Sequence, residues 1–252
     1  MVDLRALVAY LDTLLECGRI QDYAPNGLQV EGRARVGRLV TGVSASLALL
    51  EAAREAGADA VLVHHGYFWR GESPCVTGMR RARLALLLEA QMSLLAYHLP
   101  LDAHPKLGNN AALGRILGLP QDGRFAPGEG PEIVFWGELP EPLPLAELAR
   151  RVATRLGRDP LVVAGGEHPV RRIAWCSGAA QGYLEAVAAR GFDAYLSGEI
   201  SEPTFHAARE LGVHYLAAGH HATERYGVRT LGEHLAQHFG IEHRHVEIDN
   251  PV

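Results

Sequence analysis

The residues most able to do chemistry are two histidines and a glutamate in the segment YLAAGHHATERY, residues 215–226. An apolar run, Leu216–Ala218, predicts the end of a buried strand, and Gly219 predicts a turn into a helix. On that helix, His220 and Glu224 would lie four residues apart on one face. There they could hold one metal ion or one substrate group.

Further residues of this kind stand where two other predicted strands end. His64 and His65 follow the predicted strand Ala60–Val63, and Asp102 lies four residues after His98. In open α/β sheets, ligands bind at the carboxyl ends of the strands. Structural roles are the alternative for each residue taken alone, because histidines at a strand end also bond to backbone and an aspartate also caps a loop.

Together these residues supply three imidazoles and two carboxylates, which are ligand types for zinc, iron or manganese. Five groups are more than one tetrahedral ion takes, so two divalent ions bridged by a carboxylate fit better. Such a pair leaves a charge of about +2, which favours a bound hydroxide and an anionic substrate, as in metal-dependent hydrolysis. The predicted metal ligands are His64, His65, Asp102, His220 and Glu224.

The predicted elements that position these residues occur twice. A strand, a helix and a second strand span residues 38–65, and residues 172–199 match them without a gap, with nine identical pairs in twenty-eight. In both copies a glycine, Gly57 or Gly191, ends the helix. After each copy come a helix and a strand, and then a histidine that precedes an acid by four residues. We interpret this recurrence as an internal duplication.

The duplication assigns roles to residues near the predicted ligands. Glu199 occupies the position of His65 in the second copy, and we predict that it transfers protons. Adjacent residues of a strand point to opposite faces, so His64 and His65 can share a site only if the chain turns, which Gly66 allows. Supporting or solvent-exposed roles are predicted for His98, His104, His206 and His221.

Alternating strands and helices predict an α/β fold of two similar lobes, with the metal site in the cleft between them. We predict a first lobe at residues 1–125 and a second at 126–252. The stretch 118–131 is rich in glycine and proline and is the predicted hinge. Beyond it the sequence predicts a turn at Pro140–Pro144 and a helix over Leu145–Leu156. The segment Arg70–Met79 has no partner in the second copy, and we expect it to be a lid near His65.

Composition narrows the function further. The chain has 252 residues, 48% of them hydrophobic, which is enough for one large core or two modest ones. A net charge of −5 argues against a nucleic-acid groove. The three cysteines form no CxxC pair and are expected to be reduced thiols. No leader segment and no apolar run near the ~20 residues of a membrane span are present, so we expect a soluble, cytoplasmic protein.

Four longer motifs follow one another over nearly the whole chain: DYAPNGLQV, LVHHGYFWRGE, YHLPLDAHPKLGNNAALGRILGL and YLSGEISEPTFHAARELGVHYLAAGHHATERYGVRTLGEHL. Together they resemble the NIF-three-like family, whose bacterial members are often labelled type 2 GTP cyclohydrolase I homologues. The resemblance implies two related α/β lobes, a dinuclear metal centre and a ring-shaped homohexamer. The family's metal ligands fall on the same five residues predicted above. The chain resembles the short form, without the inserted middle domain, and it has Val43-Ser44-Ala45 where many members carry an aspartate.

We therefore expect a metal-dependent hydrolase with two divalent ions per chain, acting on a nucleotide or a related small anion. GTP cyclohydrolysis, which the resemblance implies, needs hydroxide attack at carbon 8 of the purine. The alternative is a non-catalytic metal-binding ring that serves as a scaffold, a metal carrier or a chaperone-like partner. A doubled set of ligands at strand ends favours chemistry, because it is more than a scaffold requires.

Overall fold

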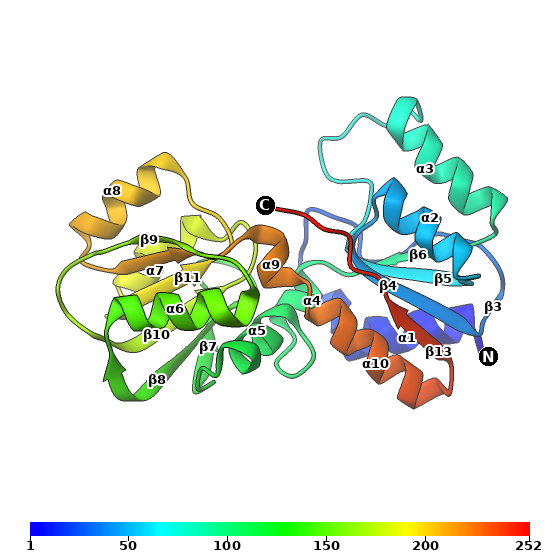
Figure 1. The fold of residues 1–252 in the computed structure, drawn as a ribbon. Helices are drawn as coiled ribbons and strands as arrows, with labels where there is room; N and C mark the ends of the chain where they lie inside the picture. Colours follow the sequence, from blue (N-terminus) through cyan, green and yellow to red (C-terminus); the bar gives the residue numbers. More distant parts are fainter. The chain divides into compact units, whose positions relative to one another are not determined.

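Two α/β units, each with its own sheet, make up the chain in the computed structural model, which describes residues 1–252 (Figure 1). The first unit comprises Met1–Leu101 and Gly227–Asp249. The second comprises Asp102–Tyr226 and Asn250–Val252. No helix combines the length and the apolar character that crossing a bilayer requires.

These units and the predicted lobes, 1–125 and 126–252, have different boundaries. The predicted hinge, 118–131, lies inside the second unit and contains a strand, β7 (Gly123–Phe125). The last helix and the last strand return to the first unit, because β13 pairs with β4 in parallel register. Pairing between such distant segments leaves no local mark in the sequence.

The first unit has a five-stranded sheet in the order β13-β4-β5-β6-β2. Strands β13, β4, β5 and β6 are parallel to one another, and β2 runs antiparallel at the edge. A short antiparallel pair joins β1 with β3. The strands are β1 (Val2–Asp3), β2 (Gly27–Val30), β3 (Arg35–Val36), β4 (Arg38–Ser44), β5 (Ala60–His65), β6 (Ser93–Ala96) and β13 (Glu242–His245).

Helices of the first unit begin where their capping residues allow. Asp3 accepts hydrogen bonds from the backbone N–H groups of Arg5 and Ala6 and starts α1, and Ser46 accepts from Leu49 and starts α2. Their apolar faces are buried in the unit's core. The helices are α1 (Leu4–Leu14), a 3₁₀ turn (Cys17–Arg19), α2 (Leu47–Glu55), α3 (Gly78–Glu89) and α10 (Gly227–Phe239), and the short α4 (Leu99–Ala103) follows β6.

The second unit has a six-stranded sheet in the order β7-β8-β10-β11-β12-β9. Strands β10, β11 and β12 are parallel, while β7, β8 and β9 pair in antiparallel fashion. The strands are β7 (Gly123–Phe125), β8 (Val134–Leu143), β9 (Leu161–Val163), β10 (Val170–Cys176), β11 (Ala194–Ser197) and β12 (His214–Ala217).

Helices in this unit are α5 (Asn109–Leu117), α6 (Leu145–Leu156), α7 (Leu184–Ala188), α8 (Glu202–Glu210) and α9 (His220–Glu224), with a 3₁₀ turn at Gln181–Tyr183. The bounds of α6 are those that the sequence predicts. The turn predicted at 140–144 is wrong, because β8 continues through its prolines to Leu143, between the edge strand β7 and β10. The short α9 contacts α5, which helps to fix its place after β12.

The same backbone pairings recur in the two units. Leu39 pairs with Ala60 in the first unit, and Ile173, 134 residues later, pairs with Ala194 in the second. In each unit an aspartate after the helix accepts two backbone hydrogen bonds at the start of the first strand. This aspartate is Asp59 in the first unit and Asp193 in the second. Internal duplication of one strand-helix-strand segment is our interpretation of this recurrence.

The two His-x₃-acid segments, however, are out of register by one residue. Ala60 pairs with Ser93, and its counterpart Ala194 pairs with His214. His98 lies five residues after Ser93, and Gly219 lies five residues after His214. The counterpart of His98 is therefore Gly219, and not His220 as we expected. The prediction was wrong because both segments happen to carry a histidine within one residue of the strand end.

Candidate functional site

Three histidines of the first unit come together at the end of its sheet. The ligating atoms of His64, His65 and His98 all lie within 4.8 Å of one another. The rings of His64 and His65 have centroids 4.5 Å apart, so the two neighbours share one site although they are adjacent in β5. Three imidazoles at this separation are a donor set that fits a divalent transition metal.

Hydrogen bonds hold the rings of both β5 histidines. The Nδ1 atom of His64 lies 2.9 Å from the carbonyl oxygen of Tyr97, and the Nδ1 atom of His65 lies 3.0 Å from the Ser44 hydroxyl. Such contacts fix the ring orientation, so Nε2 is the nitrogen that a metal site would use here. At Gly66 a side chain would collide with the Cβ atom of Ala96, so glycine is required where the chain leaves the strand.

His98 belongs to this cluster, although the sequence predicted only a supporting role for it. Its Nδ1 atom lies 3.0 Å from Asp22 Oδ1, and its backbone N–H donates to Asn26 Oδ1 at 2.7 Å. Burial alone would raise the pKa of Asp22, but the hydrogen bond and the attraction from His98, with bonds from Asn26 and Leu99, lower it to about 2. The signal in the sequence was the polar pair Asp22 and Asn26 in the segment DYAPN, which opens the first of the four motifs.

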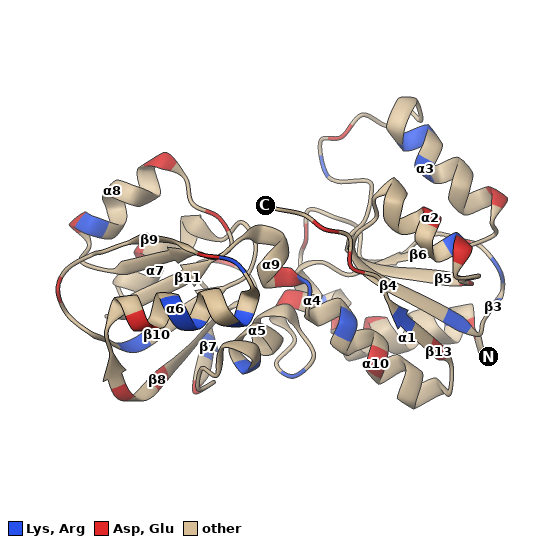
Figure 2. Cartoon of the chain, viewed as in Figure 1, with Lys and Arg blue, Asp and Glu red and all other residues tan.

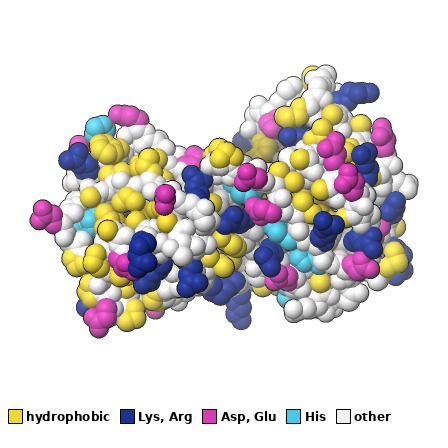
Figure 3. Space-filling view, in the orientation of Figure 1, with side chains coloured by type: hydrophobic (Ala, Val, Ile, Leu, Met, Phe, Trp, Pro, Cys, Tyr) yellow, Lys and Arg dark blue, Asp and Glu magenta, His cyan; other side chains and the backbone are white.

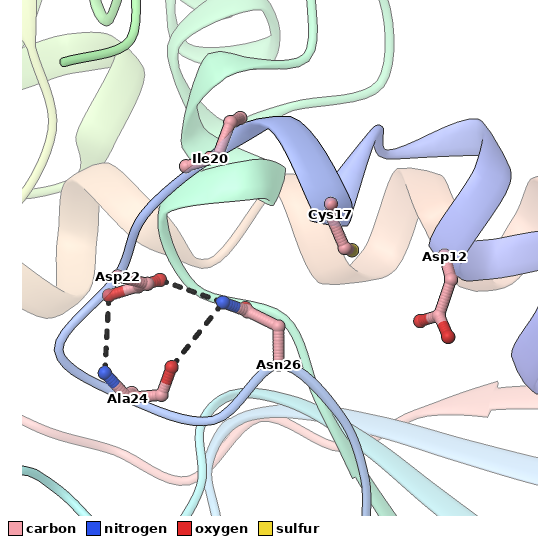
Figure 4. Close-up of a pocket in the computed structure, with 7 residues that line it drawn as sticks. Asp12, Cys17, Ile20, Asp22, Ala24 and Asn26 are labelled. Carbon is pink, nitrogen blue, oxygen red and sulfur yellow. Dashed lines mark hydrogen bonds between the residues drawn. The ribbon is translucent and has the colours of Figure 1, made fainter.

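A surface pocket of about 520 Å³ is lined in part by Asp22 and Asn26 (Figure 4). Asn26 donates to Asp22 Oδ2 at 3.0 Å, and this bond closes the loop that lines one side of the pocket. Cys17 lines another side, and burial together with the Asp12 charge raises the pKa of its thiol to about 12. A thiol with so high a pKa is a poor metal ligand.

The second unit brings together one histidine and three carboxylates. His220 Nε2 lies 3.0 Å from Glu224 Oε2, so the two residues lie on one face of α9 as the spacing predicted. His220 Nδ1 lies 2.7 Å from Glu199 Oε1. The ligating oxygens of Glu224 and Asp102 lie within 4.8 Å of each other. Figure 2 shows the acidic residues of α9 and α4 in red.

Asp102 is buried, and other side chains donate to it. Asn109 Nδ2 donates to its Oδ1 atom at 2.8 Å, and the Ser177 hydroxyl donates to the same atom at 3.3 Å. The backbone carbonyl of Asp102 accepts a bond from Asn110. This carboxylate is therefore fixed inside the unit by side-chain donors.

Two glycines make room for these groups. At Gly178, which has a φ of +64°, a Cβ atom would collide with Glu224 Oε1 and approach His220 Nε2 to 3.3 Å. At Gly219, which has a φ of +99°, a Cβ atom would collide with the guanidinium group of Arg158. Both positions need glycine for conformation and for space, and Gly178 leaves a cradle beside the two predicted ligands.

The charge of this site favours a cation. Burial alone would lower the pKa of His220, but the hydrogen bonds and charges of Glu224 and Glu199 outweigh burial and raise that pKa to about 9. The two carboxylates thus hold a proton on the imidazole at neutral pH. A metal ion that binds His220 must displace this proton, and the carboxylates then stabilise the ion in its place.

Three other histidines near the predicted ligands, for which the sequence predicts supporting or solvent-exposed roles, are His104, His206 and His221. His104 accepts a backbone bond from Leu107 at 3.0 Å, and His206 pairs with Glu202 one turn away on α8. The backbone N–H of His221 donates to the carbonyl of Val252 at 2.9 Å. None of these three belongs to a group of three or more residues that could hold a metal ion.

Each unit therefore contains side chains that could hold a metal ion, and the two sets differ in charge. The comparison with known proteins agrees with the motifs of the sequence. A family model described as Duf34/NIF3 (NGG1p interacting factor 3) matches residues 2–251. The chain belongs to the Duf34/NIF3 family.

Relatives of this Duf34/NIF3 chain match over its full length. A Pseudomonas aeruginosa protein named GTP cyclohydrolase 1 type 2 homolog is 57% identical over 251 residues, which cover 100% of this chain and 99% of that protein. A solved structure described as protein ybgI, of unknown function, has a TM-score of 0.95 at 48% identity and covers 100% of both chains. The structure of TTHA1606 from Thermus thermophilus has a TM-score of 0.87 at 37% identity, covering 100% of this chain and 99% of that one. The predicted family and the α/β fold class are confirmed.

Proposed function

We propose that this Duf34/NIF3 chain is a metal-dependent hydrolase that holds two divalent ions and acts on a nucleotide or a related small anion. The observation that carries the proposal is a set of buried or half-buried ligand side chains, of which His64, His65, Asp102 and His220 each contact a further polar group. The ions are zinc, iron or manganese, for which imidazole and carboxylate ligands are suited. The proposed ligands are His64, His65, Asp102, His220 and Glu224, drawn from both units.

The proposed ligands and the residues that orient them would have different roles. Divalent ions, when bound, polarise the bond to be cleaved and lower the pKa of a water molecule. Asp102 and Glu224 would hold the ions together with the histidines and would offset their positive charge. Ser44 orients the His65 ring, and Glu199 orients the His220 ring through Nδ1. Glu199 is therefore a positioning residue, and its predicted part in proton transfer is a separate proposal that its variants can test.

Nucleotides are the substrate class that the relatives suggest. The Pseudomonas aeruginosa relative is named a GTP cyclohydrolase 1 type 2 homolog. Two divalent ions beside two carboxylates leave a net charge of about +2, which attracts a phosphate-bearing substrate. The ring-shaped homohexamer and the cytoplasmic location remain predictions, and light scattering of the purified protein tests the first of them.

A substrate screen tests the proposal. Purified protein is stripped of metal, reloaded with zinc, iron or manganese, and assayed against nucleotides and phosphoesters. We expect turnover of at least one nucleotide by a reloaded form and none by the stripped form. Glu224→Gln is the matched control, because it removes one ligand charge from α9 while retaining the side-chain size. No turnover with any of the three metals would favour the alternative function, a metal carrier or a metal-binding scaffold.

A further inference from the structure

Three aromatic side chains lie beside the histidine cluster of the first unit, of which Tyr23 and Phe68 are exposed and Trp69 is half-buried. The Trp69 ring centroid lies 5.9 Å from that of His65 and 5.0 Å from that of His98. Tyr23 lies 5.0 Å from His98 and 5.6 Å from Trp69, and 52% of its surface is exposed. Phe68, next to Trp69, is 41% exposed. We call Tyr23, Phe68 and Trp69 the aromatic wall.

The two loops that carry the aromatic wall are fixed to each other and to the sheet. The backbone N–H of Arg70 donates to the carbonyl of Tyr23 at 2.9 Å. The indole N–H of Trp69 donates to the carbonyl of Gly66 at 3.2 Å, directly after the β5 histidines. The two loops and the Trp69 ring are therefore held in place before any ligand binds, which lowers the entropy that binding would cost.

Phe68 is held in an unusual backbone conformation. Its φ is +66°, a left-handed value that is uncommon for any residue except glycine and a clear outlier for a bulky side chain. The preceding residue, Tyr67, is held by two hydrogen bonds. Its backbone N–H donates to Gln29 Oε1 at 2.7 Å, and its hydroxyl donates to the carbonyl of Ala45 at 2.7 Å. Strained residues of this kind cluster at ligand-binding sites. Here the strain keeps a large apolar ring at the surface.

We propose that the aromatic wall binds the planar aromatic ring system of the substrate by stacking, beside the histidines that would hold the metal. Stacking on exposed aromatic side chains recognises any nucleobase, since every base has a π face. The exposed Arg70 places a cation next to the wall for a phosphate group. This inference rests on the proposed function for the metal, but it assigns the base and not the reacting bond to these residues.

Calorimetric titration of the zinc-loaded protein tests the wall with two probes, GTP and inorganic tripolyphosphate, which carry similar negative charge but differ in the base. We expect Phe68→Ala and Trp69→Leu each to weaken GTP binding about tenfold or more, which is the cost of one lost base–aromatic stack. Tripolyphosphate binding should stay within about twofold, because a probe without a base has no stack to lose. Phe205→Ala is the matched control, because Phe205 on α8 has the same exposed fraction, 41%, but lies in the other unit.

Several results would contradict the wall. It is wrong if wild-type protein binds GTP no better than tripolyphosphate, or if Phe68→Ala and Trp69→Leu bind GTP like the wild type. Metal content is measured for each variant, and if a variant loses zinc, Tyr23→Leu replaces it, since Tyr23 lies in a separate loop. Base-dependent binding without turnover would support the wall while refuting the hydrolase. Turnover of GTP with an unchanged KM in Phe68→Ala and Trp69→Leu would support the hydrolase while refuting the wall.

Discussion

The two units build their candidate ligand sets differently on the same strand-helix-strand frame. In the first unit the residues at the end of β5 are His64 and His65. Their counterparts after β11 in the second unit are Gly198 and Glu199, and neither is a predicted ligand. The second unit instead carries His220 and Glu224 on α9, the short helix after the next strand, and Asp102 on α4. Equivalent positions in a repeated frame thus need not carry equivalent chemistry.

The candidate ligand sets of the two units also differ in charge. The first unit offers three imidazoles, which are neutral when they bind a metal, and the second offers Asp102 and Glu224 besides His220. Histidines reach the surface of the first unit elsewhere as well, on α10 and β13 (Figure 3). The second unit should therefore dominate the affinity for a divalent cation, and the first should contribute selectivity for metals that prefer nitrogen.

Removal of a charged ligand from the second unit should have the largest effect. Glu224→Gln removes a negative charge from a buried position where two ions are proposed to meet. We expect the loss of metal affinity to exceed the roughly 10–100-fold that is typical of residues behind the ligands. Elemental analysis and competition with a chelator measure it, and Glu202→Gln on the exposed face of α8 is the control. Two ions per chain retained in Glu224→Gln would disprove the dominance of the second unit.

Gly178 and Ser44 occupy equivalent strand ends and give the next comparison. Gly178→Ala places a methyl group against Glu224 and His220 in a left-handed conformation, so we expect a loss of about 1–3 kcal/mol in the free energy of unfolding of the metal-free protein. Ser44→Ala removes only the hydroxyl that contacts His65, for which about 0.5–1.5 kcal/mol is typical. Urea unfolding distinguishes the two. Equal losses would mean that Gly178 forms no cradle.

Glu199→Gln tests whether Glu199 positions the His220 ring or transfers protons. Since Glu199 contacts Nδ1 of a proposed ligand, we expect metal affinity to fall about 10–100-fold. Calorimetric titration with zinc measures the change, and exposed Glu210 on α8 provides a control variant, Glu210→Gln. Unchanged metal affinity together with a ~10²–10⁴-fold loss of turnover would instead support the proton-transfer role.

The smallest expected effect is on the pH dependence of stability, and it comes from the histidines of β13, which lie away from both ligand sets. Burial lowers the pKa of His243 and of His245 from the usual 6.5, and Thr41 contacts both rings. His245 disfavours the charged form of His243, and Arg229 disfavours the charged forms of both histidines. Glu233 favours both charged forms, and Glu247 favours that of His245.

In the unfolded chain both histidines keep their ordinary pKa, so below about pH 6.5 the unfolded state binds protons that the folded state resists. Stability should therefore fall between about pH 7 and pH 5.5, by no more than about 1 kcal/mol for each histidine after solvent screening. Urea unfolding at both pH values measures the loss, and His243→Gln should reduce it. The same pH dependence in His243→Gln would exclude this histidine as its source.

Local patterns predicted much of the frame. The bounds of α6 and the i, i+4 contact of His220 with Glu224 both follow from helical spacing, which acts within a few residues. The repeat of residues 38–65 also appears in the backbone pairing of the second unit. These features are local or are copied along the chain, so a sequence can show them.

The rest depended on contacts between distant segments. The sequence does not show that β13 pairs with β4, or that Asp22 reaches His98, because the paired residues lie far apart in the chain. The role of His98 was missed for a second reason. Its apparent counterpart, His220, belongs to the next register position, and only strand pairing shows a shift of one residue.

The central claim is that the ligand sets of both units bind one pair of ions. Anomalous diffraction at the zinc edge, from crystals of the zinc-loaded protein, tests this claim most directly. We predict two peaks per chain about 3.5–4 Å apart, each within ligand distance of some of the five predicted ligands. A single peak at the cluster of His64, His65 and His98, or two peaks that lie in separate units, would contradict the account.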